Sequence, residues 1–130
     1  MFANYITSQP GSEHRITHLN DPVPRLPPIL FGFRHVSPEY WLSTGTASTS
    51  VYTPADIKVC EGIANVECNA GSKGIDLNAH LTYLGPIQVC AANPIQWRDT
   101  ESEDRYLNLA MYAALDIQYA GALVNGSLPA

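Results

Sequence analysis

Hydrophobic and polar positions alternate in short runs along the first half of the chain, which predicts short strands separated by turns. The runs with strand character lie at residues 14–19, around residues 40–42 and at residues 57–60. A short apolar run at residues 2–6 is typical of the end of a helix, and the Pro-Gly dipeptide that follows in a polar cluster signals a turn.

The first strand candidate ends at an unusual boundary. Its two faces mix polar and apolar side chains, so neither face is cleanly apolar. Asn20 and Asp21 follow it, and four prolines come within the next seven positions. A residue before proline is pushed toward extended geometry, so we expect Asp21 to be held at a strand end and not to start a helix.

The last third of the chain has the period of a helix, which we predict over about residues 103–123. Arg105, Asn108, Tyr112, Asp116 and Tyr119 form a polar stripe, and Leu107, Ala110, Met111, Ala114 and Ile117 form an apolar one. This pattern favours a helix that lies on a surface or packs against the protein, with an interfacial helix and a membrane-spanning one as alternatives. A span is disfavoured because Asp116 falls inside the apolar stretch, where a charge is costly.

Composition narrows the class of protein. The 130 residues are enough for one domain, and 45 % hydrophobic against 15 % charged residues is globular composition. The net charge of −5 argues against nucleic acid as a partner. The first 18 residues have neither a basic region nor an apolar core, so we expect no signal peptide in this chain.

The cysteines and histidines do not suggest a metal site, and we expect neither a metal nor a cofactor. No Cys-x-x-Cys motif is present. His14 and His18 are four apart, which in a strand separates them by about 13 Å. Cys60, Cys68 and Cys90 are an odd number, which leaves one cysteine without a partner in a secreted chain and is ordinary in a cytosolic one.

Asp21 and His80 are the residues most able to carry chemistry, although each has an ordinary structural explanation. Asp21 is placed to cap the turn that it begins, as Asp and Asn residues often do. His80 stands between a polar loop and an apolar run, where a half-buried histidine bonded to a backbone carbonyl is the common case.

Three stretches carry a resemblance to a known family. "RITHLNDPVPRLPP", "GFRHVSPEYW" and "NAHLTYLG", in this order and spacing, look like the C-terminal portion of the filamentous-fungal class-three lipases, and the fungal feruloyl esterases on the same fold are also similar. The resemblance implies an α/β fold, namely an incomplete α/β-hydrolase made of the C-terminal strands and loops of the sheet. The C-terminal helix predicted above from the sequence period would follow this part. We expect residues 1–90 to form the hydrolase part and residues 91–130 an extension.

The resemblance also implies a Ser-His-Asp triad, in which Asp21 is the acid and His80 the base. The order of Asp before His is that of α/β-hydrolases. Val23, Leu26 and Leu81 resemble positions that line the acyl groove, although Pro22 departs from the aliphatic residue common there. By the same resemblance Cys60 pairs with Cys68, and the partner of Cys90 lies in a missing N-terminal part.

The nucleophile motif Gly-x-Ser-x-Gly occurs nowhere in the 130 residues. We therefore expect the chain to be part of a longer secreted lipase that acts on acylglycerols or other esters at a lipid–water interface, and to be inactive alone. Two alternatives stay open at this point: a feruloyl-esterase-type fragment, and a non-enzymatic secreted or interaction protein that reuses the fold.

Overall fold

The described part of the chain is built around one small mixed sheet. The structure is a computed structural model, and it describes residues 2–11, 13–87, 108, 110–119 and 122. The three strands of the sheet are β1 (Arg15–His18), β2 (Glu39–Leu42) and β3 (Ile57–Cys60). Strand β2 is central, and it runs parallel to β1 and antiparallel to β3.

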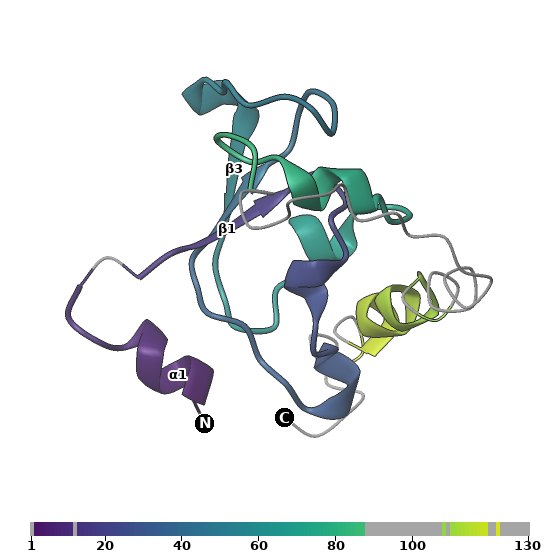
Figure 1. The fold of residues 1–130 in the computed structure, drawn as a ribbon. Helices are drawn as coiled ribbons and strands as arrows, with labels where there is room; N and C mark the ends of the chain where they lie inside the picture. The colour runs from purple at the N-terminus through teal and green to yellow at the C-terminus, as the bar shows by residue number, and fades with distance from the viewer. Residues whose placement is uncertain (1, 12, 88–107, 109, 120–121, 123–130) are drawn as a thin grey trace.

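Helical segments surround this sheet. Helix α1 (Phe2–Thr7) precedes it and lies to one side of it, whereas the helix at residues 110–119 lies on the opposite side of the picture (Figure 1). The remaining helical segments are 3₁₀ turns: η1 (Val23–Arg25), η2 (Ile29–Phe31), η3 (Pro54–Asp56), η4 (Asn69–Gly71) and η5 (Leu77–Leu81).

All three predicted strands and the short N-terminal helix are confirmed. The parallel register pairs Arg15 with Glu39 and His18 with Leu42, and the antiparallel register pairs Glu39 with Cys60. A parallel pair needs a long connection. The 20 residues between the bounds of β1 and β2 supply it, and they contain η1 and η2.

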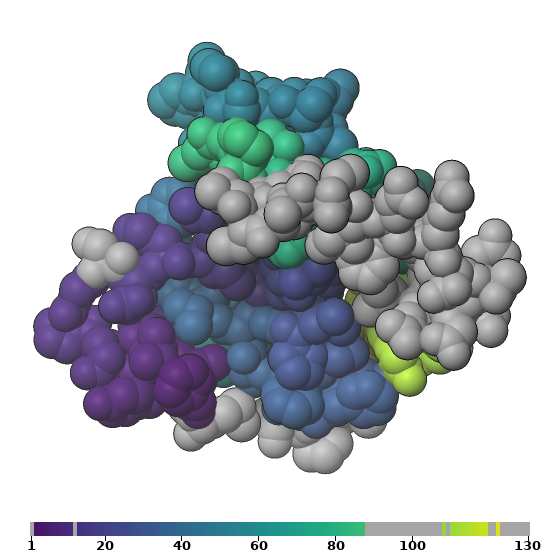
Figure 2. Space-filling view, in the orientation of Figure 1, coloured from purple at the N-terminus to yellow at the C-terminus, as the bar shows by residue number. Residues whose placement is uncertain are grey.

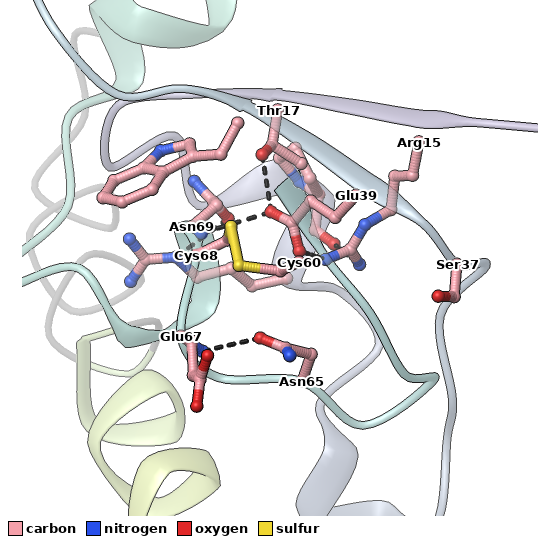
Figure 3. A network of polar contacts seen from close by, with 12 residues as sticks. Arg15, Thr17, Ser37, Glu39, Cys60, Asn65, Glu67, Cys68 and Asn69 are labelled. Carbon is pink, nitrogen blue, oxygen red and sulfur yellow. Dashed lines mark hydrogen bonds and ion pairs between the residues drawn. A yellow bond between two sulfur atoms is a disulfide. The ribbon is translucent and has the colours of Figure 1, made fainter. Parts of the chain in front are cut away.

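The buried side of the sheet is polar, which explains why neither face of the first strand candidate reads as apolar. Glu39 is 2 % exposed and accepts hydrogen bonds from Arg15, from the Thr17 hydroxyl (2.6 Å) and from the backbone N–H of Asn69 (3.2 Å). Figure 3 shows these side chains converging on Glu39. A buried carboxylate is tolerated only when it is paired and hydrogen-bonded in this way.

A second polar cluster joins η1 to η4. The Arg25 side chain donates to Asn69 Oδ1 (3.3 Å), to the Gly74 carbonyl (3.2 Å) and to the Ser72 hydroxyl (2.5 Å). Burial lowers the pKa of Arg25 from its ordinary value, and the charges of Asp21 and Glu39 act in the opposite direction. The turn that follows Asp21 is therefore fixed to a segment almost fifty residues later.

The predicted disulfide between Cys60 and Cys68 is present (Figure 3). It links the end of β3 to the N-cap residue of η4, so the polar cluster around Asn69 is attached covalently to the sheet. A disulfide closing so short a loop contributes roughly 2–3 kcal/mol in the chain-entropy model.

The C-terminal helix is confirmed where the structure describes it, since residues 108, 110–119 and 122 are helical. Its contact with the rest of the protein is made by the polar stripe. Asp116 is 3 % exposed and accepts from the backbone N–H groups of Ile29 (2.8 Å) and Leu30 (2.6 Å), whereas Met111 and Ile117 of the apolar stripe are 48 % and 38 % exposed.

Aromatic packing supports this contact. The rings of Phe31 and Tyr112 meet edge to face, with centroids 5.4 Å apart. Figure 2 shows the yellow atoms of the helix against the blue atoms of the segment that contains η2. Within the described ranges, no helix is both long and apolar enough to cross a membrane.

Replacing Asp116 by alanine tests this docking. The change leaves two backbone N–H groups without their acceptor, so we expect the free energy of unfolding to fall by about 2 kcal/mol. Amide hydrogen exchange at residues 110–119 should become faster. Gln118→Ala, an exposed change on the same helix, is the matched control. Unchanged protection in Asp116→Ala would contradict the docking.

Candidate active site

Strand β1 leaves the sheet through a residue with an unusual backbone conformation. Leu19 has a φ of +41°, a region that bulky residues rarely adopt. Its carbonyl accepts hydrogen bonds from Trp41 Nε1 (2.7 Å) and Asn69 Nδ2 (3.0 Å), while its N–H still donates to the Leu42 carbonyl (2.9 Å). These bonds fix the point at which the chain turns away, two residues before Asp21.

Asp21 lies just past this strand end, as predicted, and the structure shows that it is fully buried. Its Oδ1 accepts from the backbone N–H of Val23 (2.8 Å), which is the turn-capping role expected of an Asp at this place. A helical turn begins directly afterwards with Pro22 as its N-cap, because the restriction before proline applies to Asp21 and not to Pro22 itself, whose φ of −77° is already helical.

The second carboxylate oxygen of Asp21 contacts His80. His80 lies in η5, which Asp76 caps by accepting from the Asn78 N–H (2.9 Å). The distance from His80 Nδ1 to Asp21 Oδ2 is 2.9 Å, across 59 positions of sequence. The partner of His80 is therefore a buried carboxylate and not a backbone carbonyl, so the ordinary explanation for His80 is wrong.

The contact with an ionised Asp21 determines which tautomer of the His80 ring is favoured. An ionised carboxylate only accepts hydrogen bonds, so the proton of a neutral His80 ring lies on Nδ1 and the lone pair on Nε2. The His80 side chain is 39 % exposed, whereas that of Asp21 is 0 % exposed. The ring is therefore held from its buried edge and remains accessible to solvent.

Tyr83 is a second donor to the same carboxylate oxygen. Its hydroxyl lies 2.5 Å from Asp21 Oδ2 and donates to it. Burial raises the pKa of Tyr83 far above its ordinary value, and the hydrogen bond to Asp21 and the negative charge there act in the same direction. The phenol therefore keeps its proton and remains a donor to Asp21.

Several curated proteins are similar to the chain, although no family model matches it. It is 50 % identical over 119 residues to secreted mono- and diacylglycerol lipase 1 of Fusarium solani, covering 91 % of this chain and 35 % of that protein. It is 44 % identical over 93 residues to secreted mono- and diacylglycerol lipase A of Penicillium cyclopium, covering 68 % and 28 %. The lipase of Rhizomucor miehei is 35 % identical over 88 residues, covering 65 % and 22 %.

Solved structures agree with these relatives. A mono- and diacylglycerol lipase from Aspergillus oryzae superposes with a TM-score of 0.61 at 33 % identity, covering 69 % of this chain and 34 % of that one. A structure described as an unusual buried polar cluster in a family of fungal lipases gives a TM-score of 0.58 at 41 % identity, covering 71 % and 33 %. The chain belongs to the fungal lipase family. It spans about a third of the length of the Fusarium solani and Aspergillus oryzae lipases.

The solved structures confirm the fold predicted from the sequence, so the three-stranded sheet of this chain is part of an α/β-hydrolase fold. The apolar residues predicted to bind substrate lie near the Asp21–His80 pair along the chain. Val23 and Leu26 are 40 % and 42 % exposed, and Leu81, which follows His80, is half-buried. Their role in binding remains a prediction.

Sequence reasoning missed one contact of Asp21, and the structure leaves one sequence prediction untested. Tyr83 stands in the quoted stretch "NAHLTYLG", where an aromatic among apolar residues reads as packing and gives no sign of a carboxylate partner. Cys90 lies outside the described residues, so its pairing with a cysteine of an N-terminal part stays a prediction.

The change Tyr83→Phe tests how much the hydrogen bond from the Tyr83 hydroxyl to Asp21 contributes to the free energy of unfolding. A hydrogen bond to a charged group contributes about 1.5–3 kcal/mol, and we expect the free energy of unfolding to fall by that amount at neutral pH. Because the folded-state pKa of Tyr83 is raised above 10, its contribution is complete below pH 10 and is lost as pH rises further. The difference between wild type and variant should therefore shrink above pH 10.

Tyr5→Phe serves as the control for this measurement, since the Tyr5 residue is 61 % exposed. It should leave the unfolding free energy within about 0.5 kcal/mol of wild type. If Tyr83→Phe were equally neutral at pH 7, the Tyr83 hydroxyl would not be a significant donor to Asp21.

Proposed function

We propose that Asp21 and His80 are the acid and the base of a Ser-His-Asp hydrolase that cleaves carboxylic esters of acylglycerols. The observation that carries this proposal is the 2.9 Å contact between Asp21 Oδ2 and His80 Nδ1, made by a fully buried carboxylate and an accessible ring. Triads are recognised by geometry and roles, and this pair has both the geometry and the chain order of α/β-hydrolases.

In the proposed mechanism His80 moves the proton and Asp21 holds the ring. Nε2 of His80 takes the proton of the serine hydroxyl as the serine attacks the ester carbonyl, and later gives it to the leaving alkoxide. Asp21 keeps the proton of the neutral ring on Nδ1 and stabilises the imidazolium that forms. Tyr83 and the Val23 N–H orient the carboxylate that performs this task.

The names of the relatives and the apolar residues near the Asp21–His80 pair support acylglycerols as the substrate class. The relatives named above are mono- and diacylglycerol lipases and a lipase. Val23, Leu26 and Leu81 would contact the acyl chain, since a pocket for such a chain is lined mainly by apolar side chains. We assign residues 1–90 to the hydrolase part and residues 91–130 to an extension of it.

The serine is the missing member of this triad. The printed sequence has no Gly-x-Ser-x-Gly motif, so we propose that the nucleophile belongs to a segment outside these 130 residues and that this polypeptide alone does not turn over esters. The chain requires no cofactor in this mechanism. The names of the relatives and the Cys60–Cys68 disulfide support an extracellular enzyme.

A chimera tests the proposal. Residues 1–90 replace the matching segment of the Fusarium solani relative, which supplies the remainder of a lipase, and hydrolysis of a diacylglycerol emulsion is measured. Asp21→Asn in this chimera should lower kcat by a factor on the order of 10⁴ while the fold survives, because the imidazole is then held in the wrong tautomer.

The control is Asp56→Asn, which changes a carboxylate bonded to Thr44 and Thr53, away from Asp21 and His80. It should keep kcat within a factor of about three, in line with the small effects of surface substitutions. Near-normal turnover of Asp21→Asn would refute the role of Asp21. Faster cleavage of methyl ferulate than of acylglycerol by the chimera would favour the feruloyl-esterase alternative.

A further inference from the structure

His18 is a fully buried histidine that the proposed mechanism does not use. It lies on β1, three positions before Asp21. Its Nδ1 is 2.9 Å from the carbonyl oxygen of Ala79, the residue before His80. Its Nε2 is 2.8 Å from the Tyr52 hydroxyl. Both ring nitrogens therefore have polar neighbours, although the ring has no access to solvent.

The first of these contacts determines where a proton lies. A backbone carbonyl only accepts hydrogen bonds, so Nδ1 of His18 must carry the proton and donate it to Ala79. Ala79 is itself fully buried. Within the part of the chain that the structure describes, this is the one hydrogen bond that connects β1 to the backbone of residues 77–81.

His18 also packs against the second donor to Asp21. The ring centroids of His18 and Tyr83 are 5.5 Å apart in an edge-on arrangement, and Tyr83 donates to Asp21 Oδ2. The Tyr52 ring lies 5.9 Å away in a similar arrangement. The Tyr52 hydroxyl also lies 2.8 Å from the Thr49 carbonyl, so its single proton is shared between two acceptor positions, that carbonyl and Nε2 of a His18 ring protonated on Nδ1.

Two side chains, His18 and Asp21, thus contact two adjacent residues of η5, Ala79 and His80. From β1 and the residues that follow it, the His18 ring reaches the backbone of Ala79 and the Asp21 carboxylate reaches the ring of His80. The His80 ring is 39 % exposed and lies on a five-residue 3₁₀ turn whose N-cap, Asp76, donates its backbone N–H to the Asn20 carbonyl (3.1 Å). The bond from His18 to Ala79 fixes the same turn at a second point, at the residue adjacent to His80.

We propose that His18 is a positioning residue for the Asp21–His80 pair, acting through the Ala79 carbonyl and the Tyr83 ring. The proposal rests on the proposed function, since it supposes that the pair is catalytic. His18 touches neither ester nor serine, and its effect is to fix the η5 backbone relative to β1 so that His80 Nδ1 stays within hydrogen-bond distance of Asp21.

A matched pair of variants tests this role in the full 130-residue chain. Asparagine has an N–H at the position of Nδ1, whereas leucine has nearly the same size and no donor. The chain is labelled with ¹⁵N-histidine, and the readout is the proton resonance of His80 Nδ1, which is visible only when that proton is held in a hydrogen bond. We expect the resonance to be lost in His18→Leu and retained in His18→Asn.

His14→Leu is the control, because His14 lies next to β1, is exposed, and its ring contacts Tyr40 instead of η5. It should leave the His80 resonance in place. Retention of the resonance in a folded His18→Leu chain, or equal loss in both His18 variants, would overturn the proposal.

One measurement on the wild-type chain keeps the proposal falsifiable even if His18→Leu does not fold. Long-range ¹H–¹⁵N couplings report the tautomer of His18, and a ring protonated only on Nε2 would overturn the donation to Ala79. If His18 has the expected tautomer but the His80 resonance is absent in wild type, the catalytic pair itself is refuted, and the role of His18 falls with it. Failure of the two proposals can thus be told apart.

Discussion

The structure depends most on the burial of one carboxylate. Asp21 is completely removed from solvent, and an ionised carboxylate in that position is tolerated only if hydrogen bonds replace water. Three donors do so: the Val23 N–H, the His80 ring and the Tyr83 hydroxyl. One donor lies next to Asp21 in sequence and two lie about sixty positions later, so satisfying this charge also brings the end of β1 and η5 together.

Two further polar clusters connect the sheet and η1 to η4. Glu39 gathers Arg15, Thr17 and the Asn69 backbone beneath the sheet, and Arg25 joins η1 to η4. The Cys60–Cys68 disulfide attaches that segment to β3. Buried polar networks are stabilising when every member is satisfied and costly when one is not. This arrangement suits a site that has to hold two side chains in one geometry, since directional bonds define position more narrowly than apolar contact does.

Local signals in the sequence were sufficient to predict the strands and the strand boundary at Asp21. Alternation, proline restriction and turn residues act within a few positions, and they predicted all three strands. The assignment of Asp21 and His80 as partners needed the family resemblance, because no local signal relates residues 59 positions apart. Their contact is present, while their catalytic roles remain proposals.

The features that could not be predicted from the sequence have one property in common. Each of them depends on a partner that is distant in the chain. Leu19 adopts a positive φ because Trp41 and Asn69 hold its carbonyl, and nothing about a leucine in a strand indicates this. The sequence pattern places Asp116 in a polar stripe of the helix, and nothing in that pattern indicates that Asp116 is buried against backbone N–H groups 86 and 87 positions earlier. A pattern on one helix cannot show such an acceptor role.

The central claim is that a buried acid, three residues beyond the end of β1, holds His80 ready to take a proton from a serine. The most direct test is the labelling rate of the chimera's serine with a fluorophosphonate, a reagent that reacts with a serine activated by a base. Rapid stoichiometric labelling that disappears in His80→Ala is the result this account predicts. Equal labelling rates with and without the His80 imidazole would contradict it.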